Sequence, residues 1–260
     1  MIGEIVIPAR LASTRLPEKL LLCETGKSVL EHTYRACQTA TGPRGITVAV
    51  DHEKLFSTVL AFGGHAQFTN VNAQSGTDRV AEVARSRPEV DVFINVQGDE
   101  PEIAGSSIDA VMQLLESDPN AQVATLATPI RTRQDLEDPA CVKVVRSLDG
   151  VALYFSRSVI PHARSWDDGL LTREPAVFLQ HLGVYAYRRE FLLSLDQLGA
   201  SELEQVEKLE QLRFLQSGCR IRVGVVAKSP RGIDTREDYD NFKKRCLSSR
   251  WSKETCGQNT

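Results

Sequence analysis

The sequence has no long apolar run, no excess of positive charge and no export signal. No stretch approaches the roughly 18 apolar residues that a membrane span needs, so we expect none. The formal net charge is -3, whereas nucleic-acid-binding domains usually carry a clear excess of Lys and Arg, so we expect no nucleic-acid partner. Pro8 and Arg10 interrupt the first apolar run, which indicates a core strand and not an export signal.

The sequence also lacks paired cysteines and the common phosphate-binding loops. Its six cysteines are scattered, with neither a C-x-x-C pair nor the Cys and His spacing of a zinc site. We interpret them as reduced thiols and expect a cytoplasmic protein. There is no Walker loop and no G-x-G-x-x-G turn, which disfavours the ATPase and dinucleotide-binding classes.

What is present in the first hundred residues is an alternation of short apolar runs with amphipathic stretches. This pattern is typical of an α/β fold with a mainly parallel, Rossmann-like sheet flanked by helices. Ser28 and Glu31 have the spacing of a helix-capping box, and Gly63 follows an expected helix end. We expect strands at 4–9, 45–50 and 92–96, and helices from about 28, at 54–62 and from about 77.

From residue 122 the pattern changes to one typical of antiparallel structure. Asp149 and Gly150 predict a hairpin turn between two strands. We expect strands at 122–130, 141–146, 151–157, 181–187 and 220–227, and one acidic helix at 203–216 that ends before Gly218. The prediction is a single domain over 1–246, with an antiparallel excursion at about 130–200, and then a polar, frayed tail at 247–260.

Cations gather in the connection after the first strand, where Arg10, Arg15 and Lys19 lie close together in the sequence. In an open α/β sheet the ligand crevice lies beyond the carboxyl ends of the strands, and a triphosphate there needs cationic partners. The connection is therefore a candidate phosphate site. The alternative is a solvated basic loop.

A candidate metal ligand follows the strand at 92–96, which leads directly into Gln97, Gly98 and Asp99. A carboxylate at the mouth of the sheet can hold Mg²⁺, a cation that prefers oxygen ligands. Gly98 would let the backbone approach a ligand closely. The alternative is an ordinary turn at the end of a strand.

A second candidate carboxylate, Asp234, precedes a helix near the end of the chain. It could join Asp99 around one metal ion. The alternative is that Asp234 is only the N-cap of that helix, because Asp234 and Glu237 have capping-box spacing.

Three further groups are candidates for ligand contacts. Residues 75–78 (SGTD) open a helix, and helix starts bind anions, although Ser75 and Asp78 also have capping-box spacing. His181 and Tyr185 share one face of a strand, where packing is the alternative to substrate contact. Glu207, Glu210 and Gln211 lie on the acidic helix, whose alternative reading is a solvated face.

The order of these segments resembles one family, the 3-deoxy-manno-octulosonate cytidylyltransferases, also called CMP-Kdo synthetases. The similarity covers nearly the whole chain. It rests on IPARLASTRLPEKLL, QSGTDRVAE, INVQGDEPEI, HLGVYAYRREFL, LEQVEKLEQLRFLQSG and GIDTREDYD.

The resemblance implies transfer of CMP from CTP to 3-deoxy-D-manno-octulosonate (Kdo), with release of pyrophosphate, for lipopolysaccharide-type glycan synthesis. It implies a nucleotidyltransferase sheet, Mg²⁺ as cofactor and a homodimer to which the excursion contributes. The alternatives are a cytidylyltransferase for another 3-deoxy sugar acid, such as 8-amino-Kdo or a sialic acid, and a catalytically silent nucleotide-binding relative.

By the same resemblance, Arg10, Lys19, Asp99 and Asp234 are the catalytic residues, with Arg10 and Lys19 on the CTP phosphates and both aspartates on magnesium. The residues expected near the nucleotide are Ser75, Gly76, Thr77 and Asp78. Those expected on the sugar-acid side are Arg15, Arg79, Gln97, His181, Tyr185, Glu210 and Gln211.

Overall fold

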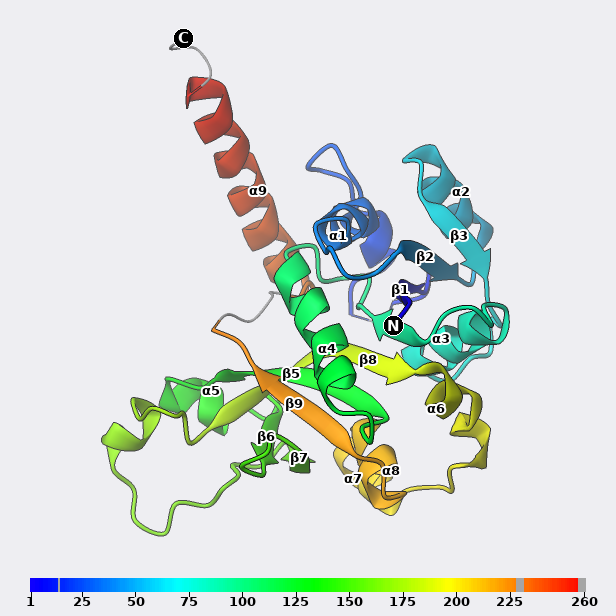
Figure 1. The fold of residues 1–260 in the computed structure, drawn as a ribbon. Helices are drawn as coiled ribbons and strands as arrows, with labels where there is room; N and C mark the ends of the chain where they lie inside the picture. Colours follow the sequence, from blue (N-terminus) through cyan, green and yellow to red (C-terminus); the bar gives the residue numbers. More distant parts are fainter. Residues whose placement is uncertain (14, 228–231, 257–260) are drawn as a thin grey trace.

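A central mixed sheet crosses the molecule, with helices on both of its faces (Figure 1). The computed structural model describes residues 1–13, 15–227 and 232–256. The main path of the sheet has the order β3-β2-β1-β4-β8-β5-β9. The expected α/β fold with a mostly parallel sheet is confirmed.

Four strands form the parallel half of the sheet: β1 (Gly3–Ala9), β2 (Gly45–Val50), β3 (His65–Phe68) and β4 (Val92–Asn95). Every residue of β1 is buried, as expected of a central strand that is covered on both faces. Successive side chains of β1 point to opposite faces, so Ile5 and Ile7 join one core cluster and Val6 the other.

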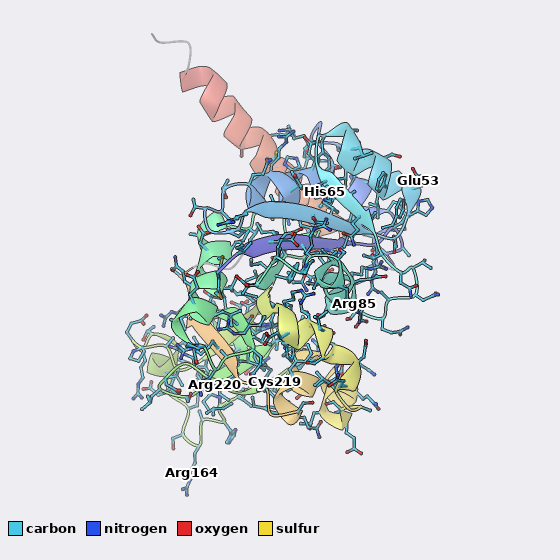
Figure 2. All side chains as sticks on the ribbon, turned by 45° about the vertical axis from the view of Figure 1, so that its right-hand side comes forward. Glu53, His65, Arg85, Arg164, Cys219 and Arg220 are labelled. Carbon is cyan, nitrogen blue, oxygen red and sulfur yellow. The ribbon has the colours of Figure 1, made fainter. Side chains whose placement is uncertain are left out.

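The other half contains β5 (Val123–Pro129), β8 (Leu179–Arg188) and β9 (Ile221–Val225). Strand β8 runs antiparallel to both β4 and β5, whereas β9 is parallel to β5. The expected excursion at about 130–200 therefore contains a strand of the central sheet. The part outside the main path includes the hairpin of β6 (Lys143–Arg146) and β7 (Ala152–Ser156) and the loop that carries Arg164, which projects from the molecule in Figure 2.

The helices divide between the two faces. One core cluster contains residues from α1 (Val29–Cys37), α2 (Glu53–Ala61), α4 (Gly105–Ser117) and α9 (Arg236–Cys256). The other core cluster contains residues from α3 (Gly76–Arg85), α6 (Arg189–Leu193) and α8 (Gln211–Gln216). The remaining elements are α5 (Arg133–Glu137), α7 (Glu202–Glu207) and the 3-10 turns η1 (Lys19–Leu21), η2 (Asp168–Leu171) and η3 (Leu195–Gln197).

The single acidic helix expected at 203–216 is wrong, because the chain breaks it into α7 and α8. Lys208 has a left-handed backbone with φ of 54°, which ends α7. The break accompanies two hydrogen bonds to the Glu207 carboxylate, from the Ser156 hydroxyl (2.6 Å) and the Arg157 amide (2.9 Å). These tertiary bonds favour the turn over continued helix.

The structure also differs from the expectation of a frayed tail from residue 247, because α9 continues to Cys256. A polar composition does not prevent a helix, because Lys, Arg and Glu are good helix formers. Residues 257–260 lie outside the described chain. Among the described residues, no helix combines the length and apolar character needed to cross a bilayer.

Gly105 gives a test of the packing of α4. A Cβ atom there would lie 2.4 Å from the Thr39 carbonyl carbon and 2.5 Å from the Ala40 nitrogen, which are backbone atoms that cannot swing away. We expect Gly105→Ala to lower the free energy of unfolding by about 1–3 kcal/mol in urea titrations. Gly199→Ala is the matched control, because nothing lies within 4 Å of a Cβ there. Equal stability of the two variants would contradict the close contact.

Candidate active site

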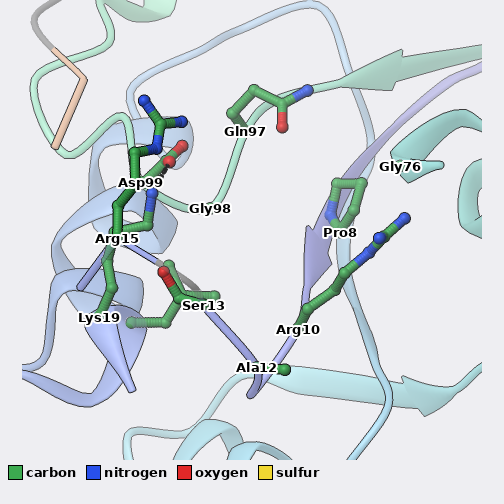
Figure 3. A pocket seen from close by; sticks show the side chains of 11 residues that line it. Pro8, Arg10, Ala12, Ser13, Arg15, Lys19, Gly76, Gln97, Gly98 and Asp99 are labelled. Carbon is green, nitrogen blue, oxygen red and sulfur yellow. Dashed lines mark hydrogen bonds and ion pairs between the residues drawn. The ribbon is translucent and has the colours of Figure 1, made fainter. Parts of the chain in front are cut away.

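A pocket of about 410 Å³ lies at the carboxyl ends of β1 and β4 (Figure 3). The loop after β1, the loop after β4 and the start of α3 form its walls. This is the edge at which open α/β sheets bind ligands. The lining residues are Pro8, Arg10, Ala12, Ser13, Arg15, Lys19, Leu20, Gly76, Gln97, Gly98 and Asp99.

An ion-pair cluster at this edge joins three distant parts of the sequence. The Lys19 ammonium pairs with the Asp99 carboxylate and lies 3.3 Å from Asp234 Oδ1. Arg15 pairs with the same Asp234 oxygen at 2.9 Å. The structure thus brings both proposed metal ligands to one ammonium group, and the Lys19 side chain is only 13% exposed.

The backbone around Asp234 explains how this residue reaches Asp99. The Ile233 amide donates to the Asp99 carbonyl oxygen at 2.9 Å. The capping of α9 falls to the next residue: the Thr235 hydroxyl accepts from the Asp238 amide at 3.2 Å, and Asp238 Oδ2 accepts from the Thr235 amide at 2.8 Å. The interpretation of Asp234 as the helix cap is therefore wrong, and its carboxylate is available to Lys19 and Arg15.

Gly98, in the loop after β4, lies against the end of β1 and the loop that follows β1. A Cβ atom at this position would lie 3.1 Å from the Pro8 carbonyl oxygen and 3.3 Å from the Leu20 side chain. The Thr33 hydroxyl, from α1, donates to the Gly98 carbonyl at 2.9 Å. The turn is therefore held against α1, and the absence of a side chain lets the two loops meet.

Arg10 differs from the other cations of the loop. Its exposed side chain lines the pocket and extends on the side of Gly76, apart from Arg15 and Lys19 (Figure 3). Within the described chain, Arg10 has no hydrogen-bond or ion-pair partner. An arginine in this state can bind an anion without first breaking another contact.

The start of α3 is a complete capping box. The Ser75 hydroxyl accepts from the Asp78 amide at 3.1 Å, and Asp78 Oδ2 accepts from the Ser75 amide at 2.9 Å. The capping role of Ser75 and Asp78 is therefore confirmed. Of residues 75–78, Gly76 is the one that lines the pocket, whereas Thr77 is buried.

Thr77 links α3 to the start of α8. Its hydroxyl donates to Glu210 Oε2 at 2.7 Å, and Arg213 pairs with Glu210 Oε1 at 3.1 Å. Burial raises the pKa of Glu210, while the hydrogen bonds from Thr77 and Ser75 oppose this change. The adjacent Gln211 is 5% exposed. The solvated-face interpretation is therefore wrong for Gln211, which is buried, while the Glu210 side chain is half-buried and held by Thr77 and Arg213.

His181 and Tyr185 lie on the same face of β8, with ring centroids 5.3 Å apart. Because β8 is antiparallel to β4 and Tyr185 pairs with Asn95, His181 lies beyond the carboxyl end of β4, toward Gln97. His181 Nε2 is 3.1 Å from the Thr125 hydroxyl, and burial lowers the pKa of His181 to about 3, so the ring is neutral at pH 7. Both rings also contribute to packing, since His181 meets Phe155 edge-on at 5.1 Å.

The position of Arg79 differs from the one expected from the resemblance. The resemblance assigned it to the substrate side, but its side chain is buried and contributes nothing to the pocket lining. Its guanidinium donates to the Thr69 hydroxyl (2.7 Å), the Asn70 carbonyl (3.1 Å) and Asp51 (3.1 Å). Arg79 faces inward from α3, so it ties the segments after β2 and β3 together instead of reaching a ligand.

The sequence reasoning passed over Glu100, which directly follows Asp99. Its Oε2 atom is buried without a hydrogen-bond partner among the described residues. Burial and the charge of Asp99 raise the pKa of Glu100 to about 8. The one available signal was a second carboxylate next to a proposed metal ligand, since like charges in close proximity shift each other's pKa.

A cation-lined pocket with a pair of carboxylates, at the carboxyl ends of parallel strands, defines a nucleotide-binding α/β protein of the nucleotidyltransferase class. A family model described as cytidylyltransferase matches residues 5–221. A 3-deoxy-manno-octulosonate cytidylyltransferase of Rhodopirellula baltica is 51% identical over 94% of this chain and 98% of its own. The chain therefore belongs to the 3-deoxy-manno-octulosonate cytidylyltransferase family, as the sequence motifs indicated.

Further relatives agree. The enzyme of the same name from Geobacter sulfurreducens is 41% identical, covering 92% of this chain and 97% of its own. A solved structure of a CMP:2-keto-3-deoxy-manno-octonic acid synthetase in complex with CTP is 39% identical, with a TM-score of 0.88 over 96% of this chain and all of its own. A cytidylyltransferase of Leptospira borgpetersenii, 15% identical with a TM-score of 0.61, shares the fold.

The lowered pKa of His181 predicts part of the loss of protein stability at acidic pH. The folded protein holds the ring neutral down to about pH 3, whereas an unfolded chain protonates it near 6.5. The contribution of the His181 ring to the free energy of unfolding is therefore fully present above pH 6.5 and is lost as the pH falls toward 3. We expect His181→Gln to lose stability less steeply than the wild type over this range, measured by urea unfolding at a series of pH values.

The control is His162→Gln, which removes an exposed imidazole. It should retain the wild-type slope. A His181→Gln profile parallel to that of the wild type would contradict the neutral state of the ring in the folded protein.

Proposed function

We propose that this protein transfers CMP from CTP to the anomeric hydroxyl of Kdo and releases pyrophosphate, for the synthesis of a lipopolysaccharide-type glycan. The observation that carries the proposal is the convergence of Asp99 and Asp234 on Lys19 beside a cationic pocket. The names of the relatives, which cover nearly the whole chain, support CTP and Kdo as substrates.

The triphosphate of CTP fits the cations of the first loop. It carries roughly three to four negative charges, which need partners in a protein of net negative charge. Arg10 has no competing partner among the described residues, and Lys19 and Arg15 end at the same edge of the pocket. The amides at the start of α3, next to Gly76, add further donors for an anion.

The carboxylate pair fits a magnesium ion. Asp99 and Asp234 offer oxygen ligands, which Mg²⁺ prefers, and Mg²⁺ is commonly held by one or two carboxylates together with substrate phosphates. The two carboxylates already share one cation, the Lys19 ammonium, so their placement suits a shared positive charge. When bound, magnesium would supply charge neutralisation at the phosphates and a lower pKa for the attacking hydroxyl.

The work of the protein itself is positioning. The proposed reaction is in-line attack of the sugar hydroxyl on the α-phosphorus, in which the protein orients both substrates and stabilises charge. Arg15 is the cation proposed for the sugar carboxylate. Gln97 lines the pocket, and the neutral His181, beyond the end of β4, can exchange hydrogen bonds with hydroxyl groups.

Tyr185, Glu210 and Gln211 complete the proposed sugar side. Glu210 is joined to the start of α3 through Thr77, and Tyr185 stacks on Tyr187 with ring centroids 5.5 Å apart. Tyr185 and Gln211 are buried and Glu210 is hydrogen-bonded, so a sugar hydroxyl that reaches them would meet side chains already fixed in place. Fixed partners favour recognition because they lose little entropy on binding.

Assembly and location are part of the same proposal. Leu148 and Leu153 of the β6-β7 hairpin and Val206 of α7 are exposed apolar residues, which supports a homodimer formed through the excursion. The free thiols of Cys23, Cys37, Cys141 and Cys219 suit a reducing compartment, so we propose the cytoplasm.

Pyrophosphate release with CTP and magnesium, measured across Kdo, 8-amino-Kdo and a sialic acid, tests the proposal. We expect the highest activity with Kdo and little with UTP or ATP in place of CTP. Activity with UTP alone would overturn the choice of nucleotide. Calorimetric binding of CTP without turnover of any sugar acid would favour the catalytically silent relative, and absence of nucleotide binding would overturn both.

Asp99→Asn tests the role of the carboxylate pair. The change keeps the shape of the side chain but removes the charge that faces Lys19, so we expect kcat/KM to fall by about a hundredfold to a thousandfold while the thermal unfolding midpoint changes little. Asp196→Asn is the matched control, because Asp196 is 79% exposed and pairs with Arg85. A fully active Asp99→Asn enzyme would defeat the assignment.

A further inference from the structure

Tyr239 connects the helix that follows Asp234 to the segment that follows Lys19. It lies in the first part of α9 and is fully buried. Its hydroxyl oxygen accepts a hydrogen bond from the Glu24 amide at 2.8 Å. The guanidinium of Arg236 lies over its ring, 5.3 Å from the centroid. The Tyr239 side chain therefore connects the segment after Lys19 to the helix after Asp234, and Lys19 and Asp234 carry opposite charges in the ion-pair cluster.

The segment that receives this bond is tightly coupled to Lys19. The Leu22 amide donates to the Lys19 carbonyl at 3.3 Å, and the Gly26 amide donates to the Cys23 carbonyl at 2.8 Å. The Val29 amide then donates to the Leu22 carbonyl at 3.0 Å, which joins the segment to α1. A shift of the Glu24 amide is thus transmitted to Lys19 through consecutive hydrogen-bonded turns.

At the other end, Asp234 is coupled to the start of α9. The amides of Asp234 and Thr235 both donate to Asp238 Oδ2, at 3.1 Å and 2.8 Å. Beside these bonds, the Ile233 amide donates to the Asp99 carbonyl at 2.9 Å, and the Tyr239 amide donates to the Thr235 carbonyl at 3.2 Å. The position of Asp234 therefore depends on where the first turn of α9 is held, and Tyr239 holds it.

Ion pairs at the same junction do not replace the tyrosine. Glu24 also pairs with Arg236 (2.8 Å) and Lys243 (2.7 Å), but these side chains are 27–51% exposed. Exposed ion pairs are screened by solvent and contribute little. The Tyr239 side chain is fully buried, so loss of its hydroxyl removes the hydrogen bond that ties the Glu24 amide to α9.

We propose that Tyr239 is a positioning residue that sets Asp234 opposite Asp99 and Lys19, and so determines how strongly magnesium and CTP bind together. The inference rests on the proposed function, in which the two carboxylates hold the metal. Tyr239 acts through Asp234 and touches no substrate.

The test is the affinity for CTP in the absence of sugar acid, measured by calorimetry on the full chain with and without Mg²⁺. The ratio of the two dissociation constants reports the coupling of metal and nucleotide. We expect Tyr239→Phe to reduce this ratio about threefold to tenfold, the range that corresponds to one lost hydrogen bond. Asp234→Asn should abolish the coupling.

Phe242→Leu is the control for a purely structural role. Phe242 is 4% exposed, packs from α9 against His32 and has no hydrogen-bonding group. It should lower the thermal unfolding midpoint and leave the ratio unchanged. Tyr239→Phe with the wild-type ratio, or Phe242→Leu with an equal loss, would overturn the positioning role alone. A wild-type protein in which Mg²⁺ does not affect CTP binding would overturn the carboxylate pair and the positioning role together.

Discussion

The arrangement of the site depends on one electrostatic constraint: two carboxylates held near each other need a cation. Asp99 and Asp234 both pair with the Lys19 ammonium, and Arg15 adds a second positive charge beside Asp234. Without these cations the two negative charges would repel each other. The free protein therefore keeps a positive charge beside the pocket in which we propose that a metal ion and a triphosphate bind.

The sheet order makes this cluster possible. Strands β1 and β4 are parallel neighbours, so the loops that carry Lys19 and Asp99 leave the sheet at the same edge. Gly98 then permits contact between these loops, because a side chain there would meet the Pro8 carbonyl. Strand β8 enters from the opposite direction, which brings His181 to that edge as well. The antiparallel neighbour of β4 thus brings a ring from a distant part of the sequence toward the edge at which the pocket lies.

The sequence predicted what local patterns determine. The buried runs at 4–9 and 45–50 and the caps at Ser28 and Ser75 are confirmed, because apolar periodicity and capping chemistry act within a few residues. Helix α4 was missed, since its N-cap, Ala104, makes no side-chain cap bond. The break at Lys208 and the burial of Arg79 depend on distant partners, Ser156 and Asp51. The proximity of Asp234 to Asp99 came from the family resemblance and not from any local pattern.

The hydrogen bond between Thr77 and Glu210 joins the start of α3 to the residue that precedes α8. Thr77 follows Gly76, which lines the pocket, so the bond links a pocket-lining segment to a distant part of the sequence. A partly buried bond to a carboxylate tolerates loss of one partner poorly. Evolution should therefore treat the two positions as a unit: a lineage that changes residue 210 would need a compensating change at residue 77.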